Sequence, residues 1–222
     1  MRKGTFCKLR EQERLFRKNS ILDAVIKVSK KKDFYQTSMS EIAMELGIST
    51  TSIYRYFPSQ RILFFEAFIR DFSKLDPIIK EILEKPDSGE KNNRALDDLA
   101  DVIVNYLLTS EAAYQMLGLL VTDRNIPDQF MEKFYCLRDK LNKRIIGVLK
   151  RSGIKKPDVN APRVFLSSVI GAVLAFKNYP EKNMANPEES IKELTRFTVT
   201  VVKSGLLSLK EQPCGNFEVR LA

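Results

Sequence analysis

Apolar residues recur at intervals of three and four positions through most of this sequence, which is the spacing of one buried face of an α-helix. Residues 13–31 are the first segment to show the pattern. Glycine and proline, nine of each, stand mostly between the periodic segments, where they end helices. Long alternating runs of β-branched residues, the usual sign of strands, do not occur. The 222 residues suffice to bury a hydrophobic core, so the sequence predicts an all-α globular protein.

About nine helices are predicted, in a small N-terminal module and a larger helical bundle. Apolar residues after Pro77 could continue the fourth of these helices. The expected domains are residues 1–60, residues 61–210 and a C-terminal tail at 211–222. Besides 13–31, the predicted helices lie near residues 39–46, 49–56, 59–76, 92–109, 111–123, 127–151, 161–179 and 188–210.

Most of the net charge of +9 lies at the start of the chain. Residues 1–61 hold 13 lysines and arginines against 6 acidic residues, a net of +7. Such an uneven distribution is typical of a chain in which one module contacts a polyanion such as nucleic acid. A basic surface that is merely solvated is the alternative.

The absence of histidine excludes several kinds of site. Ser-His-Asp and Cys-His nucleophiles and histidine-ligated metals all require the imidazole. Three widely separated cysteines lack the spacing of a zinc site or a disulfide framework, so neither a metal nor a cofactor is expected. No apolar run approaches the roughly 18 residues that span a bilayer, and residues 1–19 lack the apolar centre of a signal peptide. We therefore expect a cytoplasmic protein without a membrane segment.

Residues 38–56 have the pattern of a helix-turn-helix. Ser38 and Glu41 form the sequence signature of a capping box at the start of the first helix, and Gly47 suits the left-handed position at its end. The second helix, capped by Ser49 or Thr50, carries hydroxyls and a guanidinium that suit phosphates and base edges. The predicted internal packing residues are Ile42, Ala43, Leu46, Ile48 and Ile53, and the predicted exposed ones are Ser49, Thr50, Thr51, Ser52, Tyr54 and Arg55.

This module resembles the N-terminal domain of the tetracycline repressor (TetR) family over roughly residues 15–68. The most specific part of the resemblance is the run Ile53-Tyr54-Arg55-Tyr56-Phe57-Pro58-Ser59. The chain length and the helical remainder also fit that family's nine-helix architecture. The sequence departs from the family at Asp33, where a glycine is usual, at Thr51, where many members have a small residue, and at Gln60, where lysine is usual.

The resemblance implies a role for each matching position. Thr37 and Ser38 would bond a phosphate at a helix N-terminus, and Thr50, Thr51 and Arg55 would face the major groove. Tyr54 and Tyr56 would contact phosphates through their hydroxyls, although Tyr56, like Phe57, could instead be a core aromatic. Gln60 and Arg61 would hold the flanking strand, and the basic N-terminal arm could follow the backbone, enter a minor groove or remain solvated. Ser49 completes the predicted DNA-binding set.

The resemblance also implies that the larger domain binds a small molecule and dimerises. The helices near 161–179 and 188–210 carry the small and apolar residues that a two-fold helical interface requires. The central helices are rich in aromatic residues, which favours an apolar or flat aromatic effector, although such residues are more often simply core. The predicted effector-binding residues are Phe68, Phe72, Asp101, Tyr106, Tyr114, Leu117, Phe130, Phe134 and Phe176.

The sequence thus predicts a homodimeric, ligand-responsive regulator of transcription, most simply a repressor on a pseudo-palindromic double-stranded operator. Two alternatives stay open at this point. One is an architectural or occlusion protein that binds DNA without an effector. The other is an enzyme or carrier of apolar molecules that kept a helix-turn-helix, although no catalytic constellation is present in the sequence.

Overall fold

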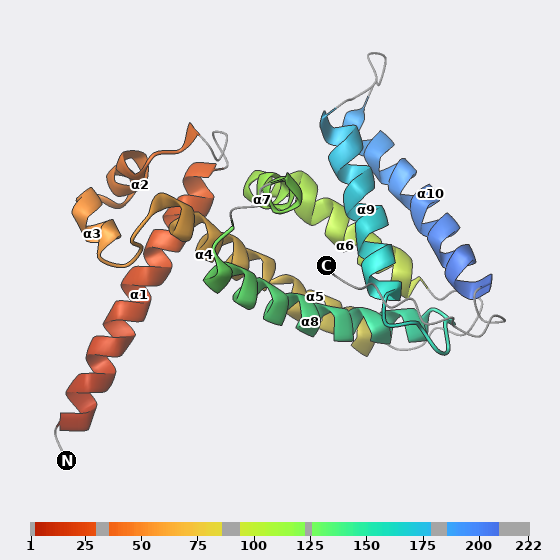
Figure 1. Cartoon of the computed structure of the whole chain (residues 1–222), viewed down its shortest axis with the longest axis horizontal. Helices are drawn as coiled ribbons and strands as arrows, with labels where there is room; N and C mark the ends of the chain where they lie inside the picture. The colour runs from red at the N-terminus through yellow and green to blue at the C-terminus, as the bar shows by residue number, and fades with distance from the viewer. Residues whose placement is uncertain (1–2, 30–35, 86–93, 123–125, 179–185, 209–222) are drawn as a thin grey trace. The chain divides into compact units, whose positions relative to one another are not determined.

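The computed structural model describes residues 3–29, 36–85, 94–122, 126–178 and 186–208, and within them the chain is all-helical (Figure 1). The predicted fold class is therefore confirmed. The described residues form ten α-helices: α1 (Lys3–Ser29), α2 (Met39–Leu46), α3 (Thr50–Tyr54), α4 (Gln60–Phe72), α5 (Leu75–Glu84), α6 (Ala95–Thr109), α7 (Glu111–Thr122), α8 (Asp128–Arg151), α9 (Ala161–Asn178) and α10 (Pro187–Ser208).

The tenth helix arises where the sequence left the continuation of the fourth helix open. The Ser73 hydroxyl donates to the Arg70 carbonyl at 2.6 Å, and such a side-chain bond competes with the helical pattern. The chain turns there, and α5 begins two residues later. Pro77 falls in the first turn of α5, where its missing N–H has no intrahelical acceptor to lose.

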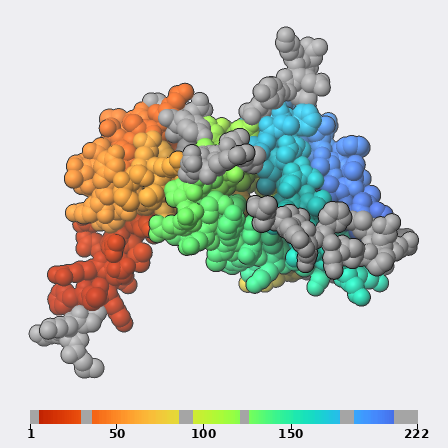
Figure 2. Space-filling model, in the orientation of Figure 1, coloured from red at the N-terminus to blue at the C-terminus, as the bar shows by residue number. Residues whose placement is uncertain are grey.

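Helix α1 begins at Lys3, ten residues before the predicted start. The basic arm, which the sequence analysis left outside the first helix, is thus helical from Lys3 onward. Arginine, lysine, glutamate and leucine are all good helix formers, and Glu13 pairs with Arg17 one turn further on at 2.5 Å. Residues 6–17 are all exposed to solvent, and Figure 2 shows these first turns standing clear of α2–α4.

The chain divides into two compact units, and the division passes through α5, α6 and α8. Unit 1 comprises Met1–Asp76 and Asn105–Leu141, and unit 2 comprises Pro77–Val104 and Asn142–Ala222. The predicted boundary at residue 60 separates the expected DNA-binding domain from the rest of the chain, whereas the two compact units are defined by packing. That boundary stays a prediction. The predicted tail at 211–222 and the departure at Asp33 lie outside the described residues.

Unit 1 is held together by apolar and aromatic side chains on α1, α2, α4, α7 and the first half of α8. Val25 of α1 and Leu63 of α4 are fully buried. The Arg70 guanidinium of α4 also bonds back to α1, to the Asp23 carboxylate at 2.6 Å and to the Asn19 carbonyl at 3.0 Å. Helix α4 is therefore packed against α1 along its length.

In unit 2, α9 and α10 lie side by side (Figure 1). Their buried residues follow helical spacing, with Phe165, Val169 and Val173 on α9 and Ile191, Thr195 and Val199 on α10. Large apolar residues also remain on the outside, because Phe197 is 69% exposed and Val201 is 54% exposed. No described helix has both the length and the apolar content that crossing a bilayer demands.

Candidate nucleic-acid interface

Helices α2 and α3 form the predicted helix-turn-helix, with the predicted caps. The Glu41 backbone N–H donates to the Ser38 hydroxyl at 3.2 Å, and the Ser38 N–H donates to the Glu41 carboxylate at 2.9 Å. Gly47 ends α2 with φ of 64° and ψ of 31°, a left-handed conformation that glycine adopts without steric cost. These local bonds fix both ends of α2 without help from the rest of the fold.

The turn between the two helices differs from the prediction at one residue. Ile42, Ala43 and Ile53 are buried as predicted, and Leu46 is half-buried. Ile48, which the sequence also places inside, is 39% exposed. Its N–H closes the turn on the Ala43 carbonyl at 3.0 Å, so its role is in the backbone of the turn rather than in the core.

Helix α3 presents a polar face to solvent. Ser49 is its N-cap, because the Ser52 N–H donates to the Ser49 hydroxyl at 3.2 Å. Ile53 faces inward and is fully buried, while Tyr54 is 48% exposed. Ser49, Thr51 and Arg55 are likewise exposed, whereas Thr50 and Ser52, also predicted to be exposed, are half-buried. The face that the sequence predicts for DNA is therefore accessible.

The start of α4 is tied to the start of α2. The Gln60 amide donates to the Thr37 carbonyl at 2.6 Å, and Ser59 caps α4 through the Ile62 N–H at 3.2 Å. The Thr37 side chain is only 1% exposed, which gives it a packing role and leaves Ser38 as the exposed hydroxyl there. The phosphate contacts predicted for Thr37 and Gln60 stay predictions.

Aromatic and cationic side chains join the module to α1 and α4. Phe57 is buried, as a core aromatic should be, and the Lys18 ammonium lies 5.5 Å from the centre of its ring. Arg61 lies over the Phe65 ring at 5.6 Å while remaining exposed. Such cation–π contacts hold the module's cations near its surface.

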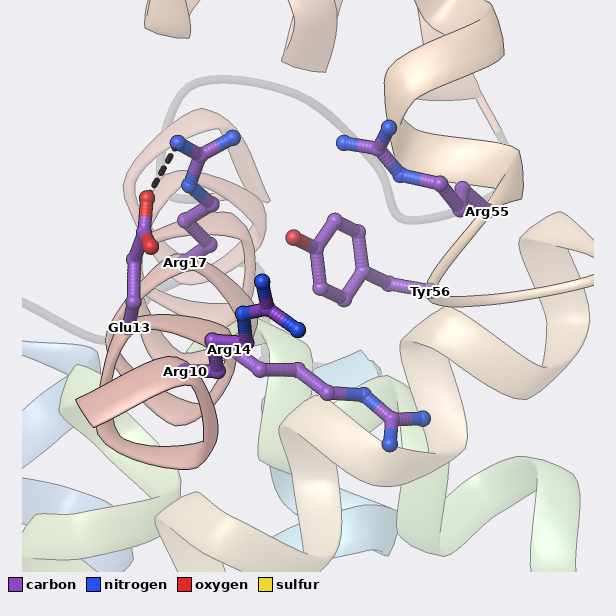
Figure 3. Close-up of a pocket in the computed structure, with 6 residues that line it drawn as sticks. All are labelled: Arg10, Glu13, Arg14, Arg17, Arg55 and Tyr56. Atoms are coloured by element: carbon purple, nitrogen blue, oxygen red, sulfur yellow. Dashed lines mark hydrogen bonds and ion pairs between the residues drawn. The ribbon is translucent and has the colours of Figure 1, made fainter. Parts of the chain in front are cut away.

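A cleft of about 510 Å³ opens between α1 and the end of α3 (Figure 3). The Arg55 guanidinium lies 5.4 Å from the centre of the Tyr56 ring, and Figure 3 shows the Tyr56 hydroxyl directed toward the α1 arginines. The sequence analysis missed this grouping, although the spacing of Arg10, Arg14 and Arg17 was a visible signal. The cleft is lined by Arg10, Glu13, Arg14, Arg17, Arg55 and Tyr56.

Residues 21–67, which contain α2, α3 and the links to α1 and α4, match the family described as bacterial regulatory proteins, tetR family. They form a TetR-family DNA-binding domain. No curated protein gives a significant match to the chain. The match covers this domain alone, and the helices beyond residue 67 lie outside it.

Solved structures extend the TetR-family likeness to the whole fold. The regulator FadR from Bacillus subtilis, in complex with stearoyl-CoA, is 16% identical with a TM-score of 0.64, over 84% of this chain and 97% of that one. A TetR-family regulator from Mesorhizobium loti is 16% identical with a TM-score of 0.65, over 86% of this chain and 97% of that one. PfmR from Thermus thermophilus is 21% identical with a TM-score of 0.58, over 81% of this chain and 97% of that one. At these identities the likeness concerns the fold.

Most of the predicted effector-binding residues contact one another within unit 1. The Phe68 ring lies 5.3 Å from Phe72, 6.4 Å from Phe130 and 6.3 Å from Phe134, centre to centre. Tyr106 lies 6.1 Å from Phe72. We call these five rings, Phe68, Phe72, Tyr106, Phe130 and Phe134, the aromatic cluster.

The remaining predicted effector residues are divided between the units. Tyr114 and Leu117 of α7 are buried in unit 1. Asp101 and Phe176 belong to unit 2 and are both half-buried. The aromatic inventory was therefore visible in the sequence, but its grouping was not.

A buried carboxylate beside the aromatic cluster was not foreseen. Asp71 is 7% exposed and accepts hydrogen bonds from the Tyr106 hydroxyl at 2.9 Å, from Ser110 at 3.3 Å and from Lys74 at 2.7 Å. Burial, and after it the neighbouring carboxylate, raises the pKa of the Tyr106 hydroxyl far above its ordinary value. Tyr106 thus remains a neutral hydrogen-bond donor throughout the physiological range.

Proposed function

We propose that this chain is a DNA-binding regulator of transcription, a homodimeric repressor that leaves its operator when an apolar small molecule binds among the side chains around the aromatic cluster. The observation that carries the proposal is the double attachment of α4. Its first residue bonds to the start of the helix-turn-helix, and its last turns carry Phe68 and Phe72. A change at the cluster therefore has a direct mechanical route to the DNA-binding module.

The proposed DNA contacts follow the exposed face of α3 and the helix starts beside it. Hydroxyls and guanidinia at these positions suit phosphates and base edges. Tyr54 supports the assignment most directly, because its exposed phenol is a hydrogen-bond donor without a described partner in the protein. The proposed set is Thr37, Ser38, Ser49, Thr50, Thr51, Tyr54, Arg55, Tyr56, Gln60 and Arg61.

The proposed dimer forms through α9 and α10. Phe197 and Val201 leave an apolar surface on α10, and two copies of such a surface can form a four-helix interface about a two-fold axis. Two DNA-binding modules would then read half-sites about 34–36 Å apart on a pseudo-palindromic operator. The site of action would accordingly be the cytoplasm, where the operator DNA is.

The proposed effector is apolar, because aromatic rings supply most of the surface that it would contact. The rings pack on one another, with Phe130 and Phe134 stacked at 6.0 Å between centres, and Phe65 beside the cluster stacks on Phe130 at 4.1 Å. A ligand must therefore separate the rings to enter. Stearoyl-CoA on the similar Bacillus subtilis fold supports the idea that this architecture accommodates a long acyl chain. Asp71 and Tyr106 would form the polar edge of such an apolar site.

Release depends on differential affinity. A ligand weakens operator binding only to the extent that it prefers the conformer whose modules are wrongly spaced for DNA. Couplings of this kind typically change affinity about 5- to 150-fold. Separating the stacked rings would displace the end of α4, and this is the conformational difference that the ligand would select.

The test begins with an operator selected by the full-length protein from a pool of randomised duplexes. Fluorescence anisotropy then measures binding to the operator and to a scrambled duplex at several salt concentrations. Titration with stearoyl-CoA, a free fatty acid and a planar aromatic compound follows. We expect a strong preference for the operator and release by at least one of these compounds.

The close packing of the aromatic cluster favours one other function, that of a DNA-binding architectural or occlusion protein without an effector. The same experiment separates the two. Equal affinity for both duplexes, together with no response to any compound, would favour the architectural role and refute the repressor.

A further inference from the structure

The cleft between α1 and α3 has a composition that the DNA-binding face alone does not require. Its six lining residues comprise four arginines, one glutamate and one tyrosine, a net charge of +3. Glu13 is paired with Arg17, and Arg10 and Arg14 form no ion pair with any other described residue. Five of the six residues are exposed and Tyr56 is half-buried, so the cleft is accessible from solvent.

The three α1 arginines are arranged as one continuous face. Arg10, Arg14 and Arg17 stand at positions i, i+4 and i+7, which superimpose on one side of a helix. The seven-residue step from Arg10 to Arg17 corresponds to about 10 Å along the helix axis. One and two turns beyond Arg17, Ile21 and Val25 continue the same face and pack into the core of unit 1. The folding of α1 thus aims the arginines toward the DNA-binding module.

The opposite wall of the cleft comes from the end of the recognition segment. Arg55 follows the last residue of α3, and its guanidinium is stacked over the Tyr56 ring. Figure 3 shows Tyr56 between Arg55 and the α1 arginines. Guanidinium groups donate in a planar fork that matches phosphate oxygens, and the tyrosine hydroxyl adds one more donor.

We propose that the Arg10, Arg14 and Arg17 face of α1 and the Arg55–Tyr56 pair together hold the sugar–phosphate backbone of the operator beside the major groove that α3 reads. The proposal rests on the proposed function of binding operator DNA and adds a second contact area to it. About 10 Å of arginine face matches the axial length of about three successive phosphates on one strand. The contact is to the backbone, so it raises affinity without reading sequence.

The arrangement also explains why α1 extends so far beyond the core. Like charges one turn apart destabilise a helix, and residues 6–16 are all exposed, so neither burial nor charge pairing accounts for Arg10 and Arg14. A backbone phosphate between the two walls would relieve that repulsion. DNA binding is then expected to slow amide hydrogen exchange in the first turns of α1.

The test is the double variant Arg10→Gln/Arg14→Gln in the full-length protein, with the selected operator and a scrambled duplex as probes. We expect affinity for both duplexes to fall about tenfold or more and by similar factors. The slope of log K against log salt should become less steep by about two, since each lost phosphate contact removes about 0.9. Glutamine keeps α1 helical, which far-ultraviolet circular dichroism verifies.

Two control variants separate the cleft from general charge. Lys155→Gln/Lys156→Gln removes the same charge from exposed positions in unit 2, and should leave the salt slope unchanged. Arg10→Lys/Arg14→Lys keeps the charge and should retain most of the slope. An equal loss in the unit 2 control and the cleft variant would overturn the proposal, because bulk charge would then explain both.

The outcomes also distinguish this inference from the proposed function. A parent protein that prefers its operator, with a cleft variant of unchanged affinity and salt slope, would refute the cleft and leave the regulator intact. A parent protein that binds both duplexes equally would refute sequence-specific operator binding. The salt slope on the scrambled duplex would still test whether the cleft contacts the DNA backbone. Calorimetric binding of pyrophosphate that the cleft variant loses, with DNA binding unchanged, would assign the cleft to a soluble anion and overturn the proposal.

Discussion

Asp71 is almost entirely withdrawn from water, and three side chains donate hydrogen bonds to it. A buried carboxylate is tolerated only when its oxygens are satisfied. Tyr106, on α6, and Ser110, just after that helix, supply two of those bonds to a residue of α4. At the scale of single residues, this polar group therefore fixes how α4 and the end of α6 meet, beside rings that by themselves would tolerate several packings.

Replacing Tyr106 by phenylalanine tests this role. The change removes the hydrogen bond to a buried carboxylate, and we expect the free energy of unfolding to fall by about 1 to 2 kcal/mol at pH 8. Ser110 and Lys74 still contact Asp71, which keeps the loss toward the lower end of the usual range. Urea denaturation followed by circular dichroism measures it, and the exposed Tyr135→Phe is the matched control. Equal stability of the two variants would contradict the assignment.

The same substitution predicts a pH effect with a definite sign. The pKa of Tyr106 is raised in the folded state, so above about pH 10 the unfolded chain releases a proton that the folded chain keeps. Stability from this group is complete below pH 10 and declines as the pH rises further. Denaturation at pH 8 to 11 should show a steeper decline for Tyr135→Phe than for Tyr106→Phe. Parallel curves would show that Tyr106 titrates normally.

At the scale of the helix, the ends of α2 are set by its own residue Glu41 and by the residues that flank it, Ser38 and Gly47. Gly47 has a positive φ and open space around the position of a Cβ atom. Substitution there should therefore cost only backbone strain, without any clash. We expect Gly47→Ala to destabilise the protein by about 1 kcal/mol, and Gly47→Asn by less, because asparagine tolerates the left-handed region. Thermal unfolding of both variants checks the order, and an alanine variant as stable as the parent would contradict it.

The same locality decides which elements could be predicted from sequence. The capping box of Ser38 and Glu41 and the stop at Gly47 are written in neighbouring residues, so α2 was predicted to its exact bounds. The first turns of α1 carry no apolar stripe that leads into a core, and a basic run without one looks like an arm. From Lys8 to Lys18 the residues are nevertheless mostly strong helix formers, and α1 continues through them.

Contacts between distant segments could not be predicted in the same way. Periodicity shows that Phe68 and Phe134 face a core, but it does not show which ring meets which. In the sequence, Asp71 cannot be distinguished from the other charged residues of a helix. Its burial depends on a contact with Tyr106 of α6, which is distant in the sequence. The arginine spacing on α1 was visible, whereas its pairing with Arg55 depends on how α1 packs against the module.

At the scale of the whole molecule, the proposed dimer depends on apolar residues that the monomer leaves in water. Phe197→Asp would place two charges in one isologous interface, one from each copy. An uncompensated buried charge costs about 3 kcal/mol or more, so we expect the dimer dissociation constant to rise at least about 100-fold. Sedimentation velocity measures this change.

The control for the dimer is Val159→Asp, which alters a more exposed residue of the same unit outside α9 and α10. It should leave the oligomeric state unchanged. Phe197→Asp should also weaken operator binding, because each module would then hold only one half-site. A parent protein that sediments as a monomer, or a Phe197→Asp variant that stays dimeric, would exclude α10 from the interface.

The double attachment of α4 has a consequence for genetics. Its residues bond to the start of α2 at one end and carry the stacked rings at the other, and Glu66 between them pairs with both Lys18 of α1 and Lys133 of α8. In a reporter screen, substitutions along α4 should therefore appear both among alleles that no longer silence the promoter and among alleles that no longer respond to inducer. Substitutions confined to α3 should fall only in the first class.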